Sequence, residues 1–332
     1  MSALGDVAMT VPVLRVLLDS YPELQLTILS KPGFKPLFSD LHTINFLEAD
    51  VYGKHKGFGL LGLANEAKAL GVDAVADLHN VIRSKILKNA LCLRGIPTAT
   101  IDKGRAEKKA LTQNHGGSIS PLESTHERYA NVFKKLGYPI DLKKHTFPER
   151  QRLSPQLNAL IGVEPKKLIG IAPFAAYKSK QYSLSLLTEV IEMLNASGKY
   201  RIFLFGGGKK EIEILKKLEA KYASATNLAG RFSLEAELAF ISNLDVMLAM
   251  DSANGHLAAM YGIPVVTLWG VTHPYAGFVP FQQPNSNQLV SNRDEFPLLP
   301  TSIYGNKFPK GYEKAMDSIP PELVVQKIKE NL

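Results

Sequence analysis

The sequence predicts an α/β protein with two domains, each built on a doubly wound parallel sheet. Three observations indicate this: a length of 332 residues, a content of 45% apolar residues, and a regular alternation of short apolar runs with amphipathic stretches. At about 150 residues per domain the length corresponds to two domains, and this apolar content can form a core in both. Alternation of strand and helix is typical of a parallel sheet covered on both faces.

The alternation is most regular in the second half of the chain. Short apolar runs predict buried strands, and apolar residues three or four positions apart predict helices. The expected strands are Leu168–Ala172, Arg201–Phe205, Ala225–Leu228, Asp245–Met250 and Pro264–Trp269. The expected helices are Leu184–Asn195, Lys209–Tyr222, a stretch that begins at Ser233, and His256–Met260.

The first half repeats the pattern less regularly. Its expected strands are Leu26–Leu29, Ile44–Leu47, Ala74–Leu78 and Thr98–Ile101. Its expected helices are Val11–Ser20, Leu60–Leu70, Val81–Leu93 and Ser124–Leu136. A small-residue turn from Ser2 to Asp6 leads into the first helix with no strand before it. Because the first strand of such a sheet lies centrally and ends at a turn of this kind, we expect that strand to be missing, with unpaired edges on its neighbours.

A stretch of prolines and charges with little periodicity, residues 137–168, separates the two halves and predicts a linker. We therefore expect an N-terminal Rossmann-like domain over residues 1–155 and a C-terminal Rossmann-like domain over residues 156–315. The last segment, residues 316–332, contains a predicted helix from Pro321 to Ile328 that can pack back toward the N-terminal domain.

Charge and cysteine content restrict the class of protein. The 39 Lys and Arg residues exceed the 31 Asp and Glu residues and leave a net charge of +8, which favours an anionic partner. No nucleic-acid motif accompanies that charge. Cys92 is the only cysteine, so no disulfide framework can form, as is typical of a reducing compartment. No apolar run reaches the roughly 20 residues that span a bilayer, and no signal peptide is recognisable. We expect a cytoplasmic protein with at most peripheral membrane contact.

A glycine triplet follows the strand that ends at Phe205. Gly206, Gly207 and Gly208 open a helix there, so free backbone amides and the positive helix end could hold a phosphate. The alternative is that the glycines only permit a tight turn. Glu211 stands at the third position of a Gly-x-Gly-x-x-Gly fingerprint, and no Gly-Lys-Ser/Thr sequence follows. Neither a nicotinamide enzyme nor a P-loop ATPase is favoured.

A second polar turn, from Met250 to His256, follows a buried strand. Its small side chains would let a bulky anion approach the helix N-terminus, and the Ser252 hydroxyl could donate a hydrogen bond to that anion. The alternative is that Asp251 or Ser252 caps the helix and His256 is a packed histidine.

Two charged residues could take part in chemistry at these strand ends. Lys180, with Lys178 beside it, could neutralise a diphosphate leaving group, although lysines at such positions are often only solvated. Asp6 could remove a proton from a hydroxyl group, and helix capping is again the alternative. The sequence has neither an Asp-x-Asp pair nor a His-Glu-x-x-His motif, so we expect no metal site.

These segments and others occur in one order along most of the chain. They are Ser2-Ala3-Leu4-Gly5-Asp6-Val7, Asp77-Leu78-His79-Asn80 with Arg83-Ser84, Lys180-Gln181-Tyr182, Phe205-Gly206-Gly207-Gly208 with Glu211, Asp251-Ser252 with His256-Leu257-Ala258-Ala259, and Leu268-Trp269-Gly270 with Thr272 and Pro274. Together they resemble glycosyltransferase family 9, the heptosyltransferases that build the inner core of lipopolysaccharide.

The resemblance implies a GT-B architecture, in which two Rossmann-like domains face each other across a cleft. It also implies an inverting transfer of heptose from ADP-heptose to a lipopolysaccharide core precursor at the inner membrane, without a cofactor. Asp6 would be the general base, and Lys180 would neutralise the diphosphate. The implied donor-binding residues are Gly206, Gly207, Glu211, Asp251, Ser252, Ala253, Gly255 and His256, and the proposed acceptor-binding residues are Ser2, Arg83, Lys103 and Arg105.

Some residues depart from the pattern of the family. Ala253 replaces a common glycine, Tyr182 a frequent tryptophan, and His273 a frequent aspartate. A basic patch of Lys103, Arg105, Lys108 and Lys109 could contact the acceptor or be a solvated loop. Two alternatives to an ADP-heptose transferase stay open. One is a non-catalytic or truncated protein that binds a sugar nucleotide or glycolipid, and the other is a family member that uses another nucleotide sugar.

Overall fold

The computed structural model describes residues 3–114 and 116–332, and the chain divides into two compact units. The first unit comprises the residues up to Arg105 together with Glu123–Thr146. The second comprises Ala106–Leu122 and Phe147–Leu332. The segment Ala106–Leu122 groups with the second unit, although it lies within the range predicted for the N-terminal domain. The predicted domain boundaries stay a prediction.

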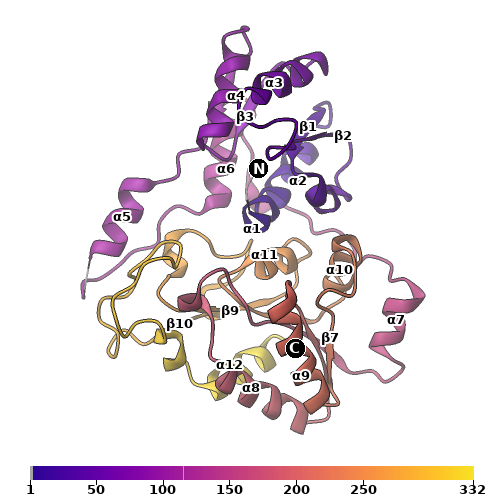
Figure 1. Ribbon diagram of the computed structural model, residues 1–332, viewed down its shortest axis with the longest axis vertical. Helices are drawn as coiled ribbons and strands as arrows, with labels where there is room; N and C mark the ends of the chain where they lie inside the picture. Colours follow the sequence, from indigo (N-terminus) through magenta and orange to yellow (C-terminus); the bar gives the residue numbers. More distant parts are fainter. Residues whose placement is uncertain (1–2, 115) are drawn as a thin grey trace. The chain divides into compact units, whose positions relative to one another are not determined.

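The second unit is built on one parallel sheet of six strands, in the order β10-β9-β8-β5-β6-β7. Figure 1 labels β7, β9 and β10 of this sheet. The strands are β5 (Lys167–Ala172), β6 (Tyr200–Leu204), β7 (Ala225–Asn227), β8 (Val246–Met250), β9 (Val265–Trp269) and β10 (Gln288–Val290). From β5 the chain proceeds to β6 and β7 on one side, and then to β8, β9 and β10 on the other. The order therefore reverses between β5 and β8, and this switch point is where open α/β sheets bind ligands.

The second unit also contains helices, and serine side chains cap several of them. They are α5 (Arg105–Gln113), α7 (Pro155–Ile161), α8 (Leu184–Ala196), α9 (Lys209–Lys221), α10 (Leu234–Ile241), α11 (Ala253–Ala259) and α12 (Pro321–Glu330). Ser183 accepts a hydrogen bond from the third residue of α8, and Ser233 does the same for α10. The predicted helix start at Ser233 is confirmed, because this hydroxyl satisfies one of the free amides of the first turn.

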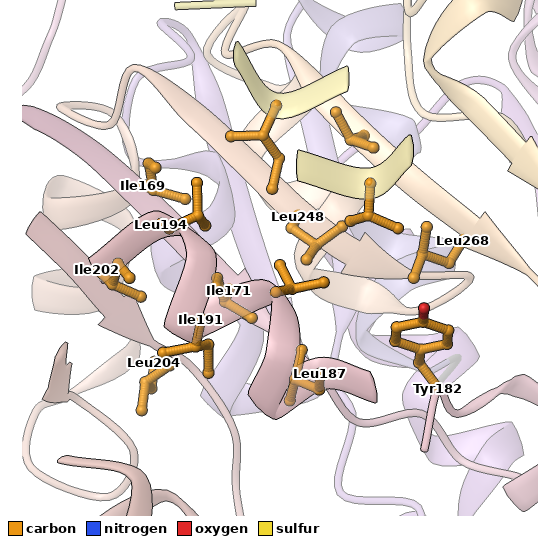
Figure 2. Packing of buried hydrophobic residues seen from close by; sticks show 14 of the residues in the cluster. Ile169, Ile171, Tyr182, Leu187, Ile191, Leu194, Ile202, Leu204, Leu248 and Leu268 are labelled. Atoms are coloured by element: carbon orange, nitrogen blue, oxygen red, sulfur yellow. The ribbon is translucent and has the colours of Figure 1, made fainter. Parts of the chain in front are cut away.

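A continuous apolar core lies under this sheet. Figure 2 shows Ile171 and Leu248 of neighbouring strands packed with Leu187 of α8, and all three side chains are fully buried. The final helix, α12, adds Val324 and Ile328 to the same core. The sequence suggested that this helix packs back toward the N-terminal domain. The structure buries its apolar face in the core of the second unit, and packing against the N-terminal domain stays a prediction.

The first unit holds two separate pairs of parallel strands. β1 (Leu26–Ser30) pairs with β2 (Ile44–Glu48), and β3 (Val75–Asp77) pairs with β4 (Thr98–Thr100). The helices of this unit are α1 (Leu4–Ala8), α2 (Thr10–Ser20), α3 (Gly59–Ala69), α4 (Ile82–Cys92) and α6 (Thr125–Lys135). No strand within the described residues joins the two pairs. The missing first strand itself stays a prediction.

Periodicity located most elements to within one or two residues but missed the least regular ones. Strand β10 and helices α1, α5 and α7 were not predicted. β10 is only three residues long and includes the polar Gln288, whose side chain accepts a hydrogen bond from the Trp269 indole N–H at 3.0 Å. So short a segment shows no apolar alternation that would predict a strand.

Candidate active site

A lysine, an aspartate and a threonine meet at the carboxyl ends of β5, β8 and β9. Lys180 Nζ lies 2.9 Å from Asp251 Oδ2, and Thr272 Oγ1 donates a hydrogen bond of 2.9 Å to the same oxygen. The side chains of Lys180 and Asp251 are only 13% and 9% exposed. A nearly buried ion pair therefore spans the switch point of the sheet, where charge-assisted contacts are poorly screened by solvent.

Close backbone contacts hold Lys180 in this position. The Val271 N–H donates to the Ser179 carbonyl at 3.3 Å, and a Cβ atom on Gly270 would lie only 2.2 Å from that carbonyl oxygen. A Cβ atom on Gly305 would lie 2.4 Å from Lys180 Cδ. Glycine is thus required at both positions, since any side chain would displace the lysine segment.

No side chain of the turn before α11 caps the helix. Ser252 stands at the N-cap without a side-chain capping bond, and its buried hydroxyl has no hydrogen-bond partner among the described residues. Asp251 is bonded to Lys180 and Thr272 instead of capping the helix. Neither residue performs the capping role that was the alternative interpretation.

The other residues of this turn pack closely on the sheet. A Cβ atom on Gly255 would contact Val265 and Pro280 at 3.4 Å, so this position brings α11 against β9. His256 is buried in α11, while Ala253 is half-buried. The helix therefore lies close to the sheet and to the ion pair.

The glycine loop after β6 is closed by its own helix. Glu211 Oε2 accepts a hydrogen bond of 2.7 Å from the Gly207 N–H, and Gly208 has a positive φ of 86° at the N-cap of α9. A Cβ atom on Gly206 would approach Leu215 and Phe174 to 3.1 Å. An anion at the Gly207 amide would have to displace the Glu211 carboxylate, and the glycines also serve the turn.

Two of the residues that depart from the family pattern are buried. Tyr182 lies in the core beside Leu268, as Figure 2 shows, and its hydroxyl donates to the Ile319 carbonyl at 2.5 Å. Burial raises the pKa of Tyr182. Burial, and secondly the charge of Arg293, lower the pKa of His273 to about 4, so this imidazole is neutral near pH 7.

In the first unit, Asp6 lies exposed in the first turn of α1. The buried Tyr129 hydroxyl donates to the Asp6 carbonyl at 3.4 Å, and burial and then the Asp6 charge raise the pKa of Tyr129. The charge of the Asp6 carboxylate therefore acts on titratable groups of α6 and of the segments that follow β3 and β4.

The charge of Asp6 acts on His79 and Lys103. Burial, and secondly the Lys103 charge, lower the pKa of His79, while Asp6 opposes that shift. Burial also lowers the pKa of Lys103, and Asp6 is the largest influence that raises it. A carboxylate, an imidazole and a half-buried ammonium group thus share the carboxyl edge of β3 and β4.

The segment after β3 folds around Asp77. Its Oδ1 accepts bonds from the N–H groups of His79 and Asn80 at 3.0 and 2.8 Å, and its Oδ2 accepts one from Ser84 Oγ at 3.1 Å. Asn80 takes a left-handed φ of 47°. The resemblance included these residues but gave them no role, and the structure shows that Asp77 and Ser84 build the turn that positions His79.

The predicted acceptor residues lie in different surroundings. The Arg83 guanidinium lies 5.6 Å from the ring centre of Tyr52, Arg105 is exposed, and Lys103 is half-buried. Ser2 lies outside the described residues. The predicted basic patch is divided between the two units, because Lys108 is buried over the Phe278 ring at 4.1 Å in the second unit.

Neither a group of metal ligands nor a membrane-spanning helix is found in the part of the chain that the structure describes. Within residues 3–114 and 116–332, no three His, Cys, Asp or Glu side chains are grouped so that they could hold a metal ion. No helix in that part of the chain is long and apolar enough to cross a bilayer.

Comparison with known proteins identifies the family. The model of glycosyltransferase family 9 (heptosyltransferase) matches residues 62–304, most of the chain. The protein is therefore a glycosyltransferase. It belongs to glycosyltransferase family 9, the heptosyltransferases, a family that acts in lipopolysaccharide core synthesis.

Individual relatives agree with this assignment. The lipopolysaccharide core heptosyltransferase OpsX of Haemophilus influenzae is 25% identical over 278 residues, covering 82% of this chain and 78% of OpsX. The glycosyltransferase family 9 structure from Veillonella parvula matches with a TM-score of 0.75 at 20% identity, over 99% of this chain and 94% of that one. The E. coli heptosyltransferase WaaC with ADP matches with a TM-score of 0.64 at 20% identity, over 100% and 98%. The fold is that of the heptosyltransferases over the full length.

Proposed function

We propose that the protein transfers heptose from ADP-heptose to a lipopolysaccharide inner-core acceptor, with inversion at the anomeric carbon and without a metal ion. The observation that carries this proposal is the buried contact between Lys180, Asp251 and Thr272 at the switch point of the second unit. Membership of glycosyltransferase family 9 and the fold shared with WaaC, whose structure contains ADP, support the choice of donor.

In the donor site, the ion pair between Lys180 and Asp251 would respond to binding of the diphosphate. Without a donor, Asp251 neutralises Lys180; with a donor bound, phosphate oxygens would compete for the same ammonium group. The unpartnered Ser252 hydroxyl and the first amides of α11 would supply further hydrogen bonds. Together these groups would stabilise the charge that develops on the departing ADP. The remaining donor contacts would come from Gly206, Gly207, Glu211, Ala253, Gly255 and His256.

The acceptor site would lie in the first unit around Asp6. An acceptor hydroxyl would attack the anomeric carbon, its proton would pass to the Asp6 carboxylate, and the bond from that carbon to the diphosphate oxygen would break. Lys103 and Arg105, with Arg83 and Ser2, would bind anionic groups of the acceptor. This reaction requires the two units to face each other across a cleft, as in the GT-B architecture, with domains over residues 1–155 and 156–315. Peripheral contact with the cytoplasmic face of the inner membrane would bring the lipid-linked acceptor to the site.

Substitution of Asp6 tests the acceptor half of this proposal. Asp6→Ala should lower the rate of ADP release from ADP-heptose with acceptor by about 100- to 10,000-fold, the usual contribution of a general base. Calorimetry with ADP should show unchanged affinity, since Asp6 would not contact the donor. Normal turnover by this variant would exclude Asp6 as the base.

Substitution of Lys180 tests the donor half. Lys180→Ala should weaken ADP binding by about 10- to 100-fold through loss of a charge-assisted contact. Lys178→Ala, two residues away and exposed, is the matched control and should bind ADP normally. Equal effects of the two substitutions would contradict a specific role for Lys180.

The separation of strands in the first unit favours a second candidate, a protein that binds a nucleotide sugar without transferring it. Such a protein would bind ADP but release no nucleotide from any sugar donor. A panel of ADP-, GDP- and UDP-sugars with core acceptors distinguishes this candidate from a transferase and identifies the donor.

A further inference from the structure

Half of the exposed large apolar side chains among the described residues lie in one short stretch of the first unit, residues 52–93. Phe58, Ile82 and Leu93 are 91%, 78% and 89% exposed. A single exposed apolar residue is ordinary, whereas a group of them on one surface is typical of a binding site. The group in this stretch comprises Tyr52, Phe58, Leu61, Leu70, Ile82, Ile86 and Leu93.

Helix α4 carries three of these side chains along one line. The helical period places Ile82, Ile86 and the C-cap residue Leu93 within about 40° of one another around the helix axis. The other side of α4 packs Leu87 and Leu91 into the apolar core of the first unit. The helix is therefore apolar on two sides, and the outer one is exposed in the part of the chain that the structure describes.

Helix α3 lies beside α4 and extends this surface (Figure 1). Phe58 at its N-cap, Leu61 and Asn65 follow one another at helical spacing on its exposed side. The Arg94 guanidinium donates a hydrogen bond to Asn65 Oδ1 and so connects the end of α4 with the middle of α3. We call the surface that the following side chains form the α3–α4 face: Tyr52, Phe58, Leu61, Ile82, Ile86 and Leu93.

Basic side chains border the apolar line on α4. Residues 78–101 contain four Lys or Arg residues and no Asp or Glu, which accounts for half of the net charge of +8. Around the helix axis, Arg83 lies on one side of the line and Lys85 on the other. The outer side of α4 therefore combines an apolar centre with positive charge on both of its borders.

The aromatic end of the α3–α4 face is also bordered by positive charge. Lys31 Nζ lies 6.0 Å and the Arg83 guanidinium 5.6 Å from the ring centre of Tyr52. Cation–π contacts of this kind hold basic groups beside the exposed ring. Glu66, the one acidic residue in the sequence of α3, is paired with Lys54, so its charge is largely neutralised.

Apolar side chains bordered by Lys and Arg fit a lipid surface better than a protein partner. Protein–protein interfaces are depleted in lysine relative to the rest of the surface. At a bilayer, by contrast, apolar side chains enter the boundary between headgroups and acyl chains, and long basic side chains reach the anionic headgroups. The α3–α4 face presents both kinds of group on one side of two packed helices.

We propose that the α3–α4 face docks on the surface of an anionic phospholipid bilayer, with Phe58, Ile82 and Leu93 inserted among the lipids and Lys85 facing the headgroups. The inference rests on the proposed function in one respect, because a lipid-linked acceptor lies in such a bilayer. Docking itself requires neither donor nor acceptor. Vesicles that contain neither therefore test the face separately from the transfer reaction.

The first test measures sedimentation of the full chain with vesicles of phosphatidylethanolamine and phosphatidylglycerol. A variant that combines Ile82→Gln, Ile86→Gln and Leu93→Gln should bind about 10- to 100-fold more weakly, because three apolar side chains no longer enter the lipid. Glutamine is a good helix former, so α4 should be retained. Replacement of phosphatidylglycerol by phosphatidylcholine should weaken binding of the parent protein by about 10-fold or more.

The matched control removes three exposed apolar side chains of the second unit. It combines Val163→Gln, Leu184→Gln and Leu323→Gln, and it should bind the vesicles as the parent protein does. Turnover with ADP-heptose and a water-soluble core fragment should be equal in the parent and in both triple variants. Loss of transfer in all three, with vesicle binding retained in the parent, would contradict the proposed function and still support docking by this face.

A second measurement adds a probe instead of removing side chains. Phe58→Trp places an indole on the α3–α4 face, whereas the native Trp269 is fully buried in the second unit. With anionic vesicles, the emission of the added indole should shift to shorter wavelength and be quenched by brominated lipid. Val163→Trp, on an exposed site of the second unit, is the control and should not respond.

The outcomes separate a lipid surface from other occupants. Weaker vesicle binding by the α4 triple variant alone, together with a lipid-dependent signal from Phe58→Trp, supports the proposal. Equal vesicle binding by the parent and the α4 variant, or an unchanged emission, would overturn it. Self-association of the parent that the α4 variant abolishes, without binding to vesicles, would assign the face to a second copy of the chain and also overturn it.

Discussion

The two units of this protein use the same alternation of strand and helix but differ in how their strands are joined. Six strands of the second unit form one continuous sheet, whereas the four described strands of the first form two pairs with a space between them. The difference shows that strand formation and sheet formation are separate problems. A local sequence pattern is enough to form each strand, whereas a strand between the two pairs is needed to join them into one sheet.

The strands of the two units also differ in how deeply their residues are buried. Every residue of β8 and β9 is buried, whereas four of the five residues of β1 are only half-buried. A central strand of a covered parallel sheet loses solvent on both faces and both edges. The strands of the first unit retain an open edge, so their side chains contribute less apolar burial to stability.

The largest expected effect compares equal truncations in the two units. Leu248→Ala in β8 removes a fully buried side chain and should cost about 3 to 5 kcal/mol of unfolding free energy. Leu29→Ala in β1 should cost about 1 kcal/mol, because this side chain is half-buried and lies beside an existing space. Denaturant titration with hydrogen exchange resolved by peptide would report each unit separately. Equal losses would show that the strands of the first unit are better packed than the space between the two strand pairs implies.

Glycine-to-alanine substitutions should change the stability less, and with opposite sign in the two units. Gly270→Ala forces a Cβ atom to 2.2 Å from the Ser179 carbonyl oxygen and should destabilise the second unit by about 1 to 3 kcal/mol. Gly62→Ala, on the exposed face of α3, meets nothing within 4 Å and should stabilise the first unit by about 0.5 to 1 kcal/mol. Thermal unfolding measures both changes. Gly207→Ala, which also has open space around its Cβ, controls for glycine replacement in the second unit.

The sequence predicts the helices and strands better than it predicts which side chains contact each other. Apolar periodicity located most helices and strands because each repeat reflects one buried face. The pairing of Lys180 with Asp251, and of Glu211 with Gly207, could not be predicted, since each depends on where the turns place side chains. Thr272 illustrates the same limit: it belonged to a recognised segment, yet only the fold shows that its hydroxyl contacts Asp251.

The smallest effect concerns a carboxyl group in the well-buried second unit. Burial raises the pKa of Glu237 in α10 to about 7, well above the ordinary value of 4.5. The folded state therefore favours the neutral form, and the penalty for ionisation is absent below pH 4.5 and complete above pH 7. Glu237→Gln should leave stability unchanged at pH 4 and increase it by about 1 kcal/mol at pH 8, after allowance for partial exposure.

Unfolding midpoints of Glu237→Gln and the parent protein across this pH range check that prediction. The difference between the two proteins isolates Glu237 from other groups that titrate in the same unit, such as His273, whose lowered pKa acts in the opposite direction below pH 6.5. Glu235→Gln on the same helix changes an exposed carboxylate and should give a flat difference. If Glu237→Gln raised the stability equally at every pH, the gain would come from helix propensity and not from the raised pKa. The burial that is typical of the second unit would then not extend to this carboxyl group.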